Sequence, residues 1–320
     1  MTNRRDFLKN TTLLAAGGLL AGRVMTSCTE TAKAAHKNFG LQLYSLTVGE
    51  MRGDKEFSTD VPGGLQRIGE MGYATLELAG YNIEGRVGAV DIKEFNKMAQ
   101  DAGLKIISTH VGAPVREFTR DNLEQCKEYW KKAFDDHASI GCKYLIQPGQ
   151  PVTRTTEEVA FVGEALNEAG KIAKAAGMIY GYHNHSGEFV RVAPEGTEVP
   201  QGGGMFRRMP EGSKIIQDAL IEATDPSLVI FELDVYWTVM GQADPVAYMR
   251  KYADRIRMLH IKDFAVLGES GAMNFQKIFE VGYENGITEY IVELENVDSG
   301  TQFEGVKGCA DYLLNAPFVK

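Results

Sequence analysis

Apolar and polar positions along the chain repeat one pattern from about residue 38 onward. An amphipathic stretch with helical spacing is followed by a glycine and then by a short apolar run. Five such units lie at Glu70–Gly80, Asp101–His110, Ser139–Gly149, Ala175–His185 and Glu284–Asn296. Each glycine falls where a helix would end in a left-handed backbone conformation, which glycine adopts without steric cost. The pattern therefore predicts helix–strand units.

Three more apolar runs, at Phe39–Leu46, Leu228–Trp237 and Ile256–Phe264, bring the predicted strands to eight. Helical patterns between strands include Asp91–Gln100, Thr155–Ala176 and Asp244–Arg255. Strict alternation predicts an α/β protein with parallel strands joined by right-handed crossovers. Eight equal units favour a single closed (β/α)8 TIM barrel over residues 38–320. An open doubly wound sheet is the alternative, but no strand is followed by the G-x-G-x-x-G turn typical of that fold.

The connection after the fifth predicted strand, Val190–Glu211, is too long and too rich in glycine and proline for an ordinary loop. On the active face of a barrel such a loop is a candidate lid or a contact in a homo-oligomer.

The first 34 residues have the pattern of an export signal. A twin-arginine segment, Asn3–Lys9, precedes a short apolar stretch, Thr11–Gly22. That stretch is shorter than the roughly 20 residues needed to span a bilayer. Met25–Cys28 resembles a lipobox, which would place a lipid anchor on Cys28, and cleavage after Ala34 is the alternative. We therefore expect an exported protein, either periplasmic or held at a membrane as a lipoprotein.

Composition and charge argue against some classes of binding partner. The chain is 44% apolar and 24% charged, which is typical of a globular protein. Its formal net charge of −9 becomes −12 if the segment before Cys28 is removed, since that segment carries four basic residues and one acidic residue. An acidic surface opposes binding to nucleic acid. Cys126, Cys142 and Cys309 lack metal-type spacing, and we expect them to be small buried apolar residues.

Polar side chains gather at the carboxyl ends of the last four predicted strands. Residues at i and i+2 share a face of a strand, so each of these strands presents a pair. The pairs are His183 with His185, Glu232 with Asp234, His260 with Lys262, and Glu293 with Glu295. Four of the six histidines, those at 110, 183, 185 and 260, end predicted strands.

These pairs would point into a closed interior, where an unpaired charge is costly to bury. A divalent cation gives several such groups a common partner, and mixed imidazole and carboxylate ligands suit Mn²⁺, Zn²⁺, Fe²⁺ or Co²⁺. A single strand histidine is more often structural, but the concentration of these residues favours a catalytic metal site at the end of the barrel where such enzymes carry their chemistry.

Four segments together resemble the xylose isomerase-like barrel superfamily, generally described as sugar phosphate isomerases/epimerases. They are Gly181–Phe189, Phe231–Pro245, Arg257–Phe264 and Tyr290–Asn296. The family's metal ligands are a carboxylate, an Asp, a His and a Glu from strands five to eight. The resemblance therefore implies one divalent ion (Mn, Zn, Fe, Co or Mg) bound by His183, Asp234, His260 and Glu293.

The fifth-strand position departs from the family, because a histidine stands where many relatives have a glutamate. In relatives with both glutamates, the two also carry the substrate proton, so a symmetrical two-glutamate epimerisation is in doubt here. The site is also less negative by one charge, which shifts its preference from Mg²⁺ toward Mn²⁺, Zn²⁺ or Fe²⁺. His183 and His185 could exchange roles as the ligand.

The resemblance implies a metal-dependent isomerase or epimerase acting on a sugar or keto-sugar through an enediolate-type intermediate. Glu293 or His185 could take the substrate proton, and Lys262 could stabilise oxyanion charge. Loss of a β-oxygen substituent from the same intermediate would instead give a lyase, a dehydratase or a keto-glycoside-cleaving enzyme. We expect Glu77, His110 and Trp237 to contact the sugar, with packing at the rim as the alternative.

Two other classes compete. A DNA-repair endonuclease of the related barrel family needs more metal ligands than the sequence places, and the acidic charge and export signal oppose it. A non-catalytic lipoprotein that binds carbohydrate would have the same fold without turnover.

Overall fold

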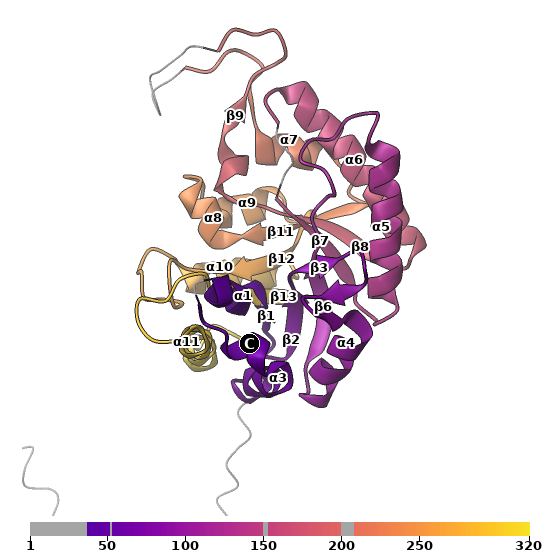
Figure 1. The fold of residues 1–320 in the computed structure, drawn as a ribbon. Helices are drawn as coiled ribbons and strands as arrows, with labels where there is room; N and C mark the ends of the chain where they lie inside the picture. The colour runs from indigo at the N-terminus through magenta and orange to yellow at the C-terminus, as the bar shows by residue number, and fades with distance from the viewer. Residues whose placement is uncertain (1–36, 52, 150–152, 200–207) are drawn as a thin grey trace, which may run out of the picture. The chain divides into compact units, whose positions relative to one another are not determined.

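Eight parallel strands close into a barrel in the computed structural model of the chain (Figure 1). The structure describes residues 37–51, 53–149, 153–199 and 208–320. The barrel strands are β1 Gly40–Gln42, β2 Thr75–Leu78, β6 Lys105–His110, β7 Tyr144–Pro148, β8 Ile179–His183, β11 Val229–Asp234, β12 Ile256–Ile261 and β13 Glu289–Val292. Gly40 pairs with Thr75 on one side and with Ile291 on the other, which closes the sheet. The predicted (β/α)8 barrel is confirmed, and each predicted strand contains one of these eight.

Helices form the outer layer (Figure 1). They are α1 Tyr44–Met51, α2 Glu56–Thr59, α3 Val61–Glu70, α4 Ile92–Asp101, α5 Leu123–Ala138, α6 Thr156–Ala175, α7 Ile216–Ala223, α8 Val235–Met240, α9 Pro245–Lys251, α10 Phe275–Glu284 and α11 Gln302–Asn315, with a 3-10 turn, η1, at Ser186–Phe189. Side-chain caps fix several starts; Asp91, for example, accepts hydrogen bonds from the amides of Lys93 and Glu94. The predicted helix Asp244–Arg255 ends earlier, at Lys251, because Tyr252 leaves the helical conformation.

The five predicted glycines all have left-handed backbones. Their φ values are 100° at Gly72, 76° at Gly103, 74° at Gly141 and 72° at both Gly177 and Gly286. Each ends a helix and turns the chain toward the next strand, as the sequence pattern predicted.

Side chains inside the barrel divide it into two halves. Ile107, Tyr144, Ile146, Met258 and Ile291 form a buried apolar cluster, contributed largely by the amino-terminal parts of their strands. Gly181 lets this cluster close, since a β-carbon there would lie 2.5 Å from Ile146 Cδ1 and 3.0 Å from Ile230 Cγ1. The carboxyl-terminal half is therefore the part left to polar groups.

Two small sheets are added to the barrel. β3 Tyr81–Asn82, β4 Arg86–Val87 and β5 Val90–Asp91 form an antiparallel sheet, and β9 Arg191–Val192 pairs with β10 Lys214–Ile215. The β9–β10 pair holds the two ends of the long connection predicted after the fifth strand. Residues 200–207 within it lie outside the described part, and its role as a lid or oligomer contact stays a prediction.

The predicted export signal, residues 1–34, lies outside the described residues, so it too stays a prediction. Within the described ranges, no helix has the length and apolar character needed to cross a bilayer. Cys126, Cys142 and Cys309 are buried and free, as expected.

His137, in the last turn of α5, is buried without exposed surface. Its Nδ1 lies 2.7 Å from the carbonyl oxygen of Ala133, and its ring packs edge-on against Tyr81 at 4.5 Å. Burial lowers the pKa of His137 to about 4. The folded protein therefore holds this imidazole neutral.

Acid should destabilise the protein through His137. As pH falls from 6.5 toward 4, the unfolded chain takes up a proton that the folded chain excludes, so the free energy of unfolding decreases. Urea unfolding of His137→Gln at pH 7 and pH 5 should show a loss on acidification about 2 kcal/mol smaller than that of the unsubstituted protein. Equal losses in both proteins would contradict this role.

Candidate metal centre

Inward-facing side chains change from apolar to polar along the last four barrel strands. On β8, β11 and β12 the alternate positions lead up to His183, Asp234 and His260, and Glu293 follows directly after β13. All four side chains are buried, with residue exposures of 1%, 0%, 0% and 5%. The barrel thus brings together the four residues that the sequence singled out as metal ligands.

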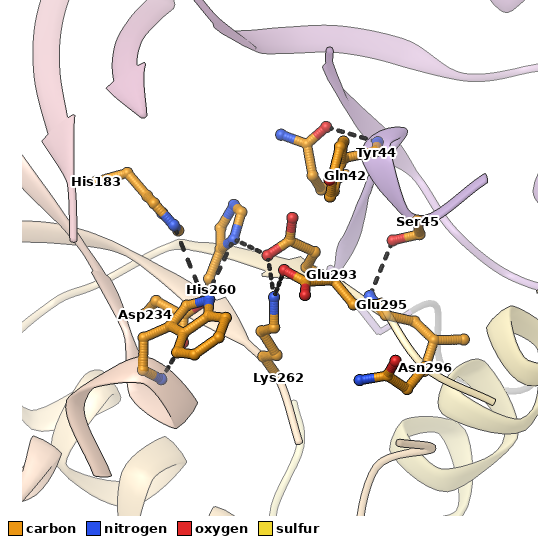
Figure 2. Close-up of polar contacts among 12 residues, drawn as sticks. Gln42, Tyr44, Ser45, His183, Asp234, His260, Lys262, Glu293, Glu295 and Asn296 are labelled. Carbon is orange, nitrogen blue, oxygen red and sulfur yellow. Dashed lines mark hydrogen bonds and ion pairs between the residues drawn. The ribbon is translucent and has the colours of Figure 1, made fainter. Parts of the chain in front are cut away.

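The four side chains lie around one point (Figure 2). His260 Nδ1 is 3.4 Å from Glu293 Oε2 and 3.9 Å from Asp234 Oδ2, and His183 Nε2 is 4.0 Å from Asp234 Oδ2. One nitrogen or oxygen from each residue lies within 4.8 Å of all the others. Ligands about 2.1 Å from a tetrahedral ion are about 3.4 Å apart, so the group is slightly wider than a closed site.

Two polar atoms of this group support a cation at its centre. Asp234 Oδ2 and His260 Nδ1 are buried and have no hydrogen-bond partner among the described residues. The other oxygen of Asp234 accepts a hydrogen bond from the amide of Trp237 at 2.7 Å, which fixes the carboxylate. A buried oxygen and nitrogen left unpaired are costly unless a ligand occupies the space between them. The residues present therefore fit a divalent ion.

A second group, His110, His183, Glu232 and His260, is equally close. Its short contacts are hydrogen bonds, since Glu232 Oε2 lies 3.0 Å from His110 Nε2 and 3.2 Å from His183 Nδ1. These atoms are already partnered, whereas, within the described part of the chain, Asp234 Oδ2 and His260 Nδ1 in the first group are not. The group containing Asp234 and Glu293 is the better metal site.

The surroundings shift the pKa values of the candidate ligands in different directions. Burial, with the neighbouring imidazoles, lowers the pKa of His183 well below its usual range. Burial raises the pKa of Asp234 to about 7. Burial would lower the pKa of His260, but Glu232, Glu293 and Glu77 outweigh it and raise that pKa. The acidic surroundings of His260 therefore favour a cation.

Lys262 holds the two glutamates beyond β13 (Figure 2). Its Nζ donates to Glu293 Oε2 at 2.8 Å and makes a shorter contact with Glu295, and it lies 5.1 Å from the centre of the Trp237 ring. Burial would raise the pKa of Glu293, but Lys262 and His260 lower it, so this carboxylate is ionised. Glu293 therefore has both a candidate ion and an ammonium group as partners.

A pocket of about 290 Å³ opens onto the centre. It is lined by Tyr44, Ala79, Gly80, His110, Pro148, His183, His185, Glu293 and Glu295. His185 lines it with a ring 5.0 Å from His183 and 5.6 Å from Trp237. Burial lowers the pKa of His185 to about 4, so it is a neutral imidazole at the pocket wall. His183 therefore lies among the candidate ligands, and His185 lies at the wall of the pocket.

The three predicted sugar contacts, beginning with Glu77, differ in position. The Glu77 side chain has no exposed surface and is not among the residues that line the pocket, and its contact with a sugar stays a prediction. His110 lines the pocket but points Nε2 away, at 3.0 Å from both Glu77 and Glu232. Trp237 is half-buried beside Lys262 and His185.

Asn184, between the two histidines, ties two strands together. Its side-chain oxygen accepts from the amide of Asp234 at 3.2 Å, and its side-chain nitrogen donates to the carbonyl of Asp234 at 3.4 Å. The sequence reasoning missed this pairing, and it also left Glu232 without a role. The sequence did indicate that Glu232 faces the interior, because it lies two residues before Asp234 on the same face of the strand. Gln42 and Ser108, which bond to Glu77, gave no such signal.

The sequence profile of the xylose isomerase-like TIM barrel family matches residues 65–307. The chain belongs to this family. A sugar phosphate isomerase/epimerase from Parabacteroides distasonis ATCC 8503 is 43% identical, with a TM-score of 0.84 over 91% of this chain and 100% of that one. The resemblance seen in the sequence is confirmed.

More distant matches differ in activity. An inosose dehydratase from Geobacillus kaustophilus is 26% identical over 215 residues, which are 62% of this chain and 60% of that enzyme. A 3-keto-D-glucoside 4-epimerase from E. coli is 14% identical, with a TM-score of 0.64 over 88% of this chain and 100% of that one, and shares the fold. The family is enzymatic and includes both isomerases or epimerases and dehydratases.

Replacing Lys262 should destabilise the folded protein. Lys262→Met leaves Glu293 buried without its ammonium partner, which costs about 3–5 kcal/mol of unfolding free energy. Urea unfolding measures the loss. Lys277→Met, which removes a half-buried surface lysine paired with Glu280, is the control and should change stability by less than about 1 kcal/mol. Similar small effects of both substitutions would show that Glu293 does not depend on Lys262.

Proposed function

We propose that the protein is a divalent-metal-dependent isomerase or epimerase that acts on a sugar or keto-sugar. The convergence of His183, Asp234, His260 and Glu293 on one point, with two buried unpaired atoms, carries the proposal. The sugar phosphate isomerase/epimerase with 43% identity supports the reaction class. The two imidazoles and two carboxylates suit Mn²⁺, Zn²⁺, Fe²⁺ or Co²⁺ better than Mg²⁺. A divalent ion held there would act as a Lewis acid on a bound carbonyl and its neighbouring hydroxyl.

The chain's own residues would move the proton. Glu293 and His185 both line the pocket and both are unprotonated at neutral pH, as a general base must be. Lys262 keeps its proton, because Glu293, Asp234 and Glu295 outweigh the effect of burial and raise its pKa. Its ammonium group could therefore stabilise negative charge on a substrate oxygen.

A dehydratase or other lyase, including a keto-glycoside-cleaving enzyme, is the second candidate. His183 replaces the fifth-strand glutamate of many relatives, so the centre lacks a matched pair of glutamate bases. Elimination needs one base and a leaving group, which suits such a one-sided arrangement. The similarity to inosose dehydratases favours this candidate. A non-catalytic carbohydrate-binding lipoprotein remains the third, and it requires no turnover at all.

We also propose export through the twin-arginine segment, with Cys28 as a candidate lipid anchor. Fractionation of cells that express the full chain tests this. Loss of export on replacing Arg4 and Arg5 by lysine would support it, whereas an unchanged distribution would contradict it.

Metal removal should abolish activity. Purified protein should bind one divalent ion per chain, and chelation should stop turnover until Mn²⁺, Zn²⁺, Fe²⁺ or Co²⁺ is restored. Asp234→Asn should lower kcat/KM about 1000-fold or more, because several kcal/mol of transition-state stabilisation depends on the ion. Asp311→Asn, an exposed carboxylate of α11, is the control. Full activity of chelated protein, or failure to bind any ion, would refute the proposal.

Product analysis should separate the candidate reactions. Turnover of keto-sugars in D₂O, followed by NMR, should place deuterium at the carbon next to the carbonyl. An isomerase or epimerase returns a saturated sugar of altered configuration or carbonyl position, whereas a dehydratase or lyase releases an unsaturated product. Ligand binding that survives chelation, with no product from any substrate, would leave only the carbohydrate-binding role.

A further inference from the structure

A buried polar layer lies directly beneath the candidate metal centre. Its two carboxylates, Glu77 on β2 and Glu232 on β11, have no exposed surface. Each makes its shortest contact with a candidate histidine ligand on the nitrogen that faces away from the centre, and Glu232 Oε2 also lies 3.4 Å from His260 Nε2. Glu232 Oε2 is 3.2 Å from His183 Nδ1, and Glu77 Oε1 is 2.7 Å from His260 Nε2.

These contacts decide which nitrogen of each ring is free. A carboxylate oxygen accepts hydrogen bonds, so the nitrogen that contacts it carries the proton. In a neutral ring, the form that can bind an ion, the lone pair then lies on the opposite nitrogen, Nε2 of His183 and Nδ1 of His260. These are the two nitrogens that face Asp234, at 4.0 and 3.9 Å. The two rings would thus bind an ion through different nitrogens, each in the tautomer that its glutamate selects.

The glutamates are themselves held in place. Glu77 accepts from Gln42 Nε2 at 2.7 Å and from Ser108 Oγ at 2.5 Å, on the two strands beside β2. His110 Nε2 lies 3.0 Å from both Glu77 Oε1 and Glu232 Oε2, so one imidazole links the two carboxylates. The layer spans β1, β2, β6 and β11 and leaves the glutamates little freedom to turn.

We propose that Glu77 and Glu232 are positioning residues that set the tautomers of His260 and His183 and so determine metal affinity, with His110 as the link between them. This rests on the proposed metal-dependent function. The two glutamates would not touch substrate. They would act by keeping a lone pair of each imidazole aimed at the ion, an arrangement whose loss typically weakens metal binding.

Metal affinity tests the proposal directly. Titration of metal-free protein with Zn²⁺ or Mn²⁺, followed by calorimetry, should show binding weaker by about 10–100-fold for Glu77→Gln and Glu232→Gln. An amide can donate to the ring nitrogen and so favour the wrong tautomer. Glu188→Gln is the matched control, since Glu188 is also buried but bonds to Tyr182 and to the backbone of His185. It should keep the affinity of the unsubstituted protein.

Tautomers can be read without any substitution. Long-range ¹H–¹⁵N spectra of the Zn²⁺-loaded protein should show a proton on Nδ1 of His183 and on Nε2 of His260. The same type of nitrogen protonated in both rings would overturn the proposal, even if the glutamine variants fail to fold. Unchanged affinity in both variants would also overturn it while leaving the metal site intact. Absence of metal binding by the unsubstituted protein would instead remove the proposed function itself.

Discussion

The cost of burying charge governs the structure of this barrel's mouth. His183, Glu232, Asp234, His260, Lys262 and Glu293 are all buried in one half of the interior. Ionisable groups at such depth are stable only when each has a partner. The fold supplies most of these partners itself, because Lys262 faces Glu293 and the two lower glutamates face imidazoles. Asp234 and His260 each keep one unpaired atom at the centre, and a bound ion would complete the pairing.

Apolar packing in the rest of the barrel offsets the free-energy cost of burying these polar groups. The amino-terminal half of the barrel is filled by isoleucine, methionine and tyrosine side chains, and the helices enclose a second, larger apolar core around the strands. Polar groups are confined to the other half, where a pocket reaches them. The barrel thus stabilises the polar site, because apolar side chains pack in one half of its interior and the polar site residues lie in the other half.

Most of the fold could be predicted from the sequence because local signals repeat. The five helix-ending glycines and the apolar runs are visible residue by residue, and all eight strands followed from them. The ends of helices were harder to predict, because helix termini depend on tertiary contacts. Helix α9, for example, ends at Lys251, earlier than the sequence pattern indicated.

For the site, the sequence predicted which side chains face the barrel interior but not their height along the barrel axis. Alternation along a strand tells which side chains share a face, and it placed His183, Asp234 and His260 on the inner face of their strands. It does not tell how high each residue lies along the barrel axis, because that depends on the stagger between strands. Glu77, a predicted sugar contact, lies in the layer below the candidate metal centre. Gln42 and Ser108 became significant only through strands that are distant in sequence.

The side chain of Asn184 has a mechanical consequence. By bonding to both backbone groups of Asp234, it extends the β8–β11 ladder one step beyond the pair of His183 and Glu232. The spacing between the fifth-strand imidazole and the sixth-strand carboxylate is therefore set by sheet register rather than by flexible side chains. The barrel cannot widen between β8 and β11 unless hydrogen bonds between these two strands break. The rigidity of the barrel therefore limits movement of the residues at the candidate metal centre.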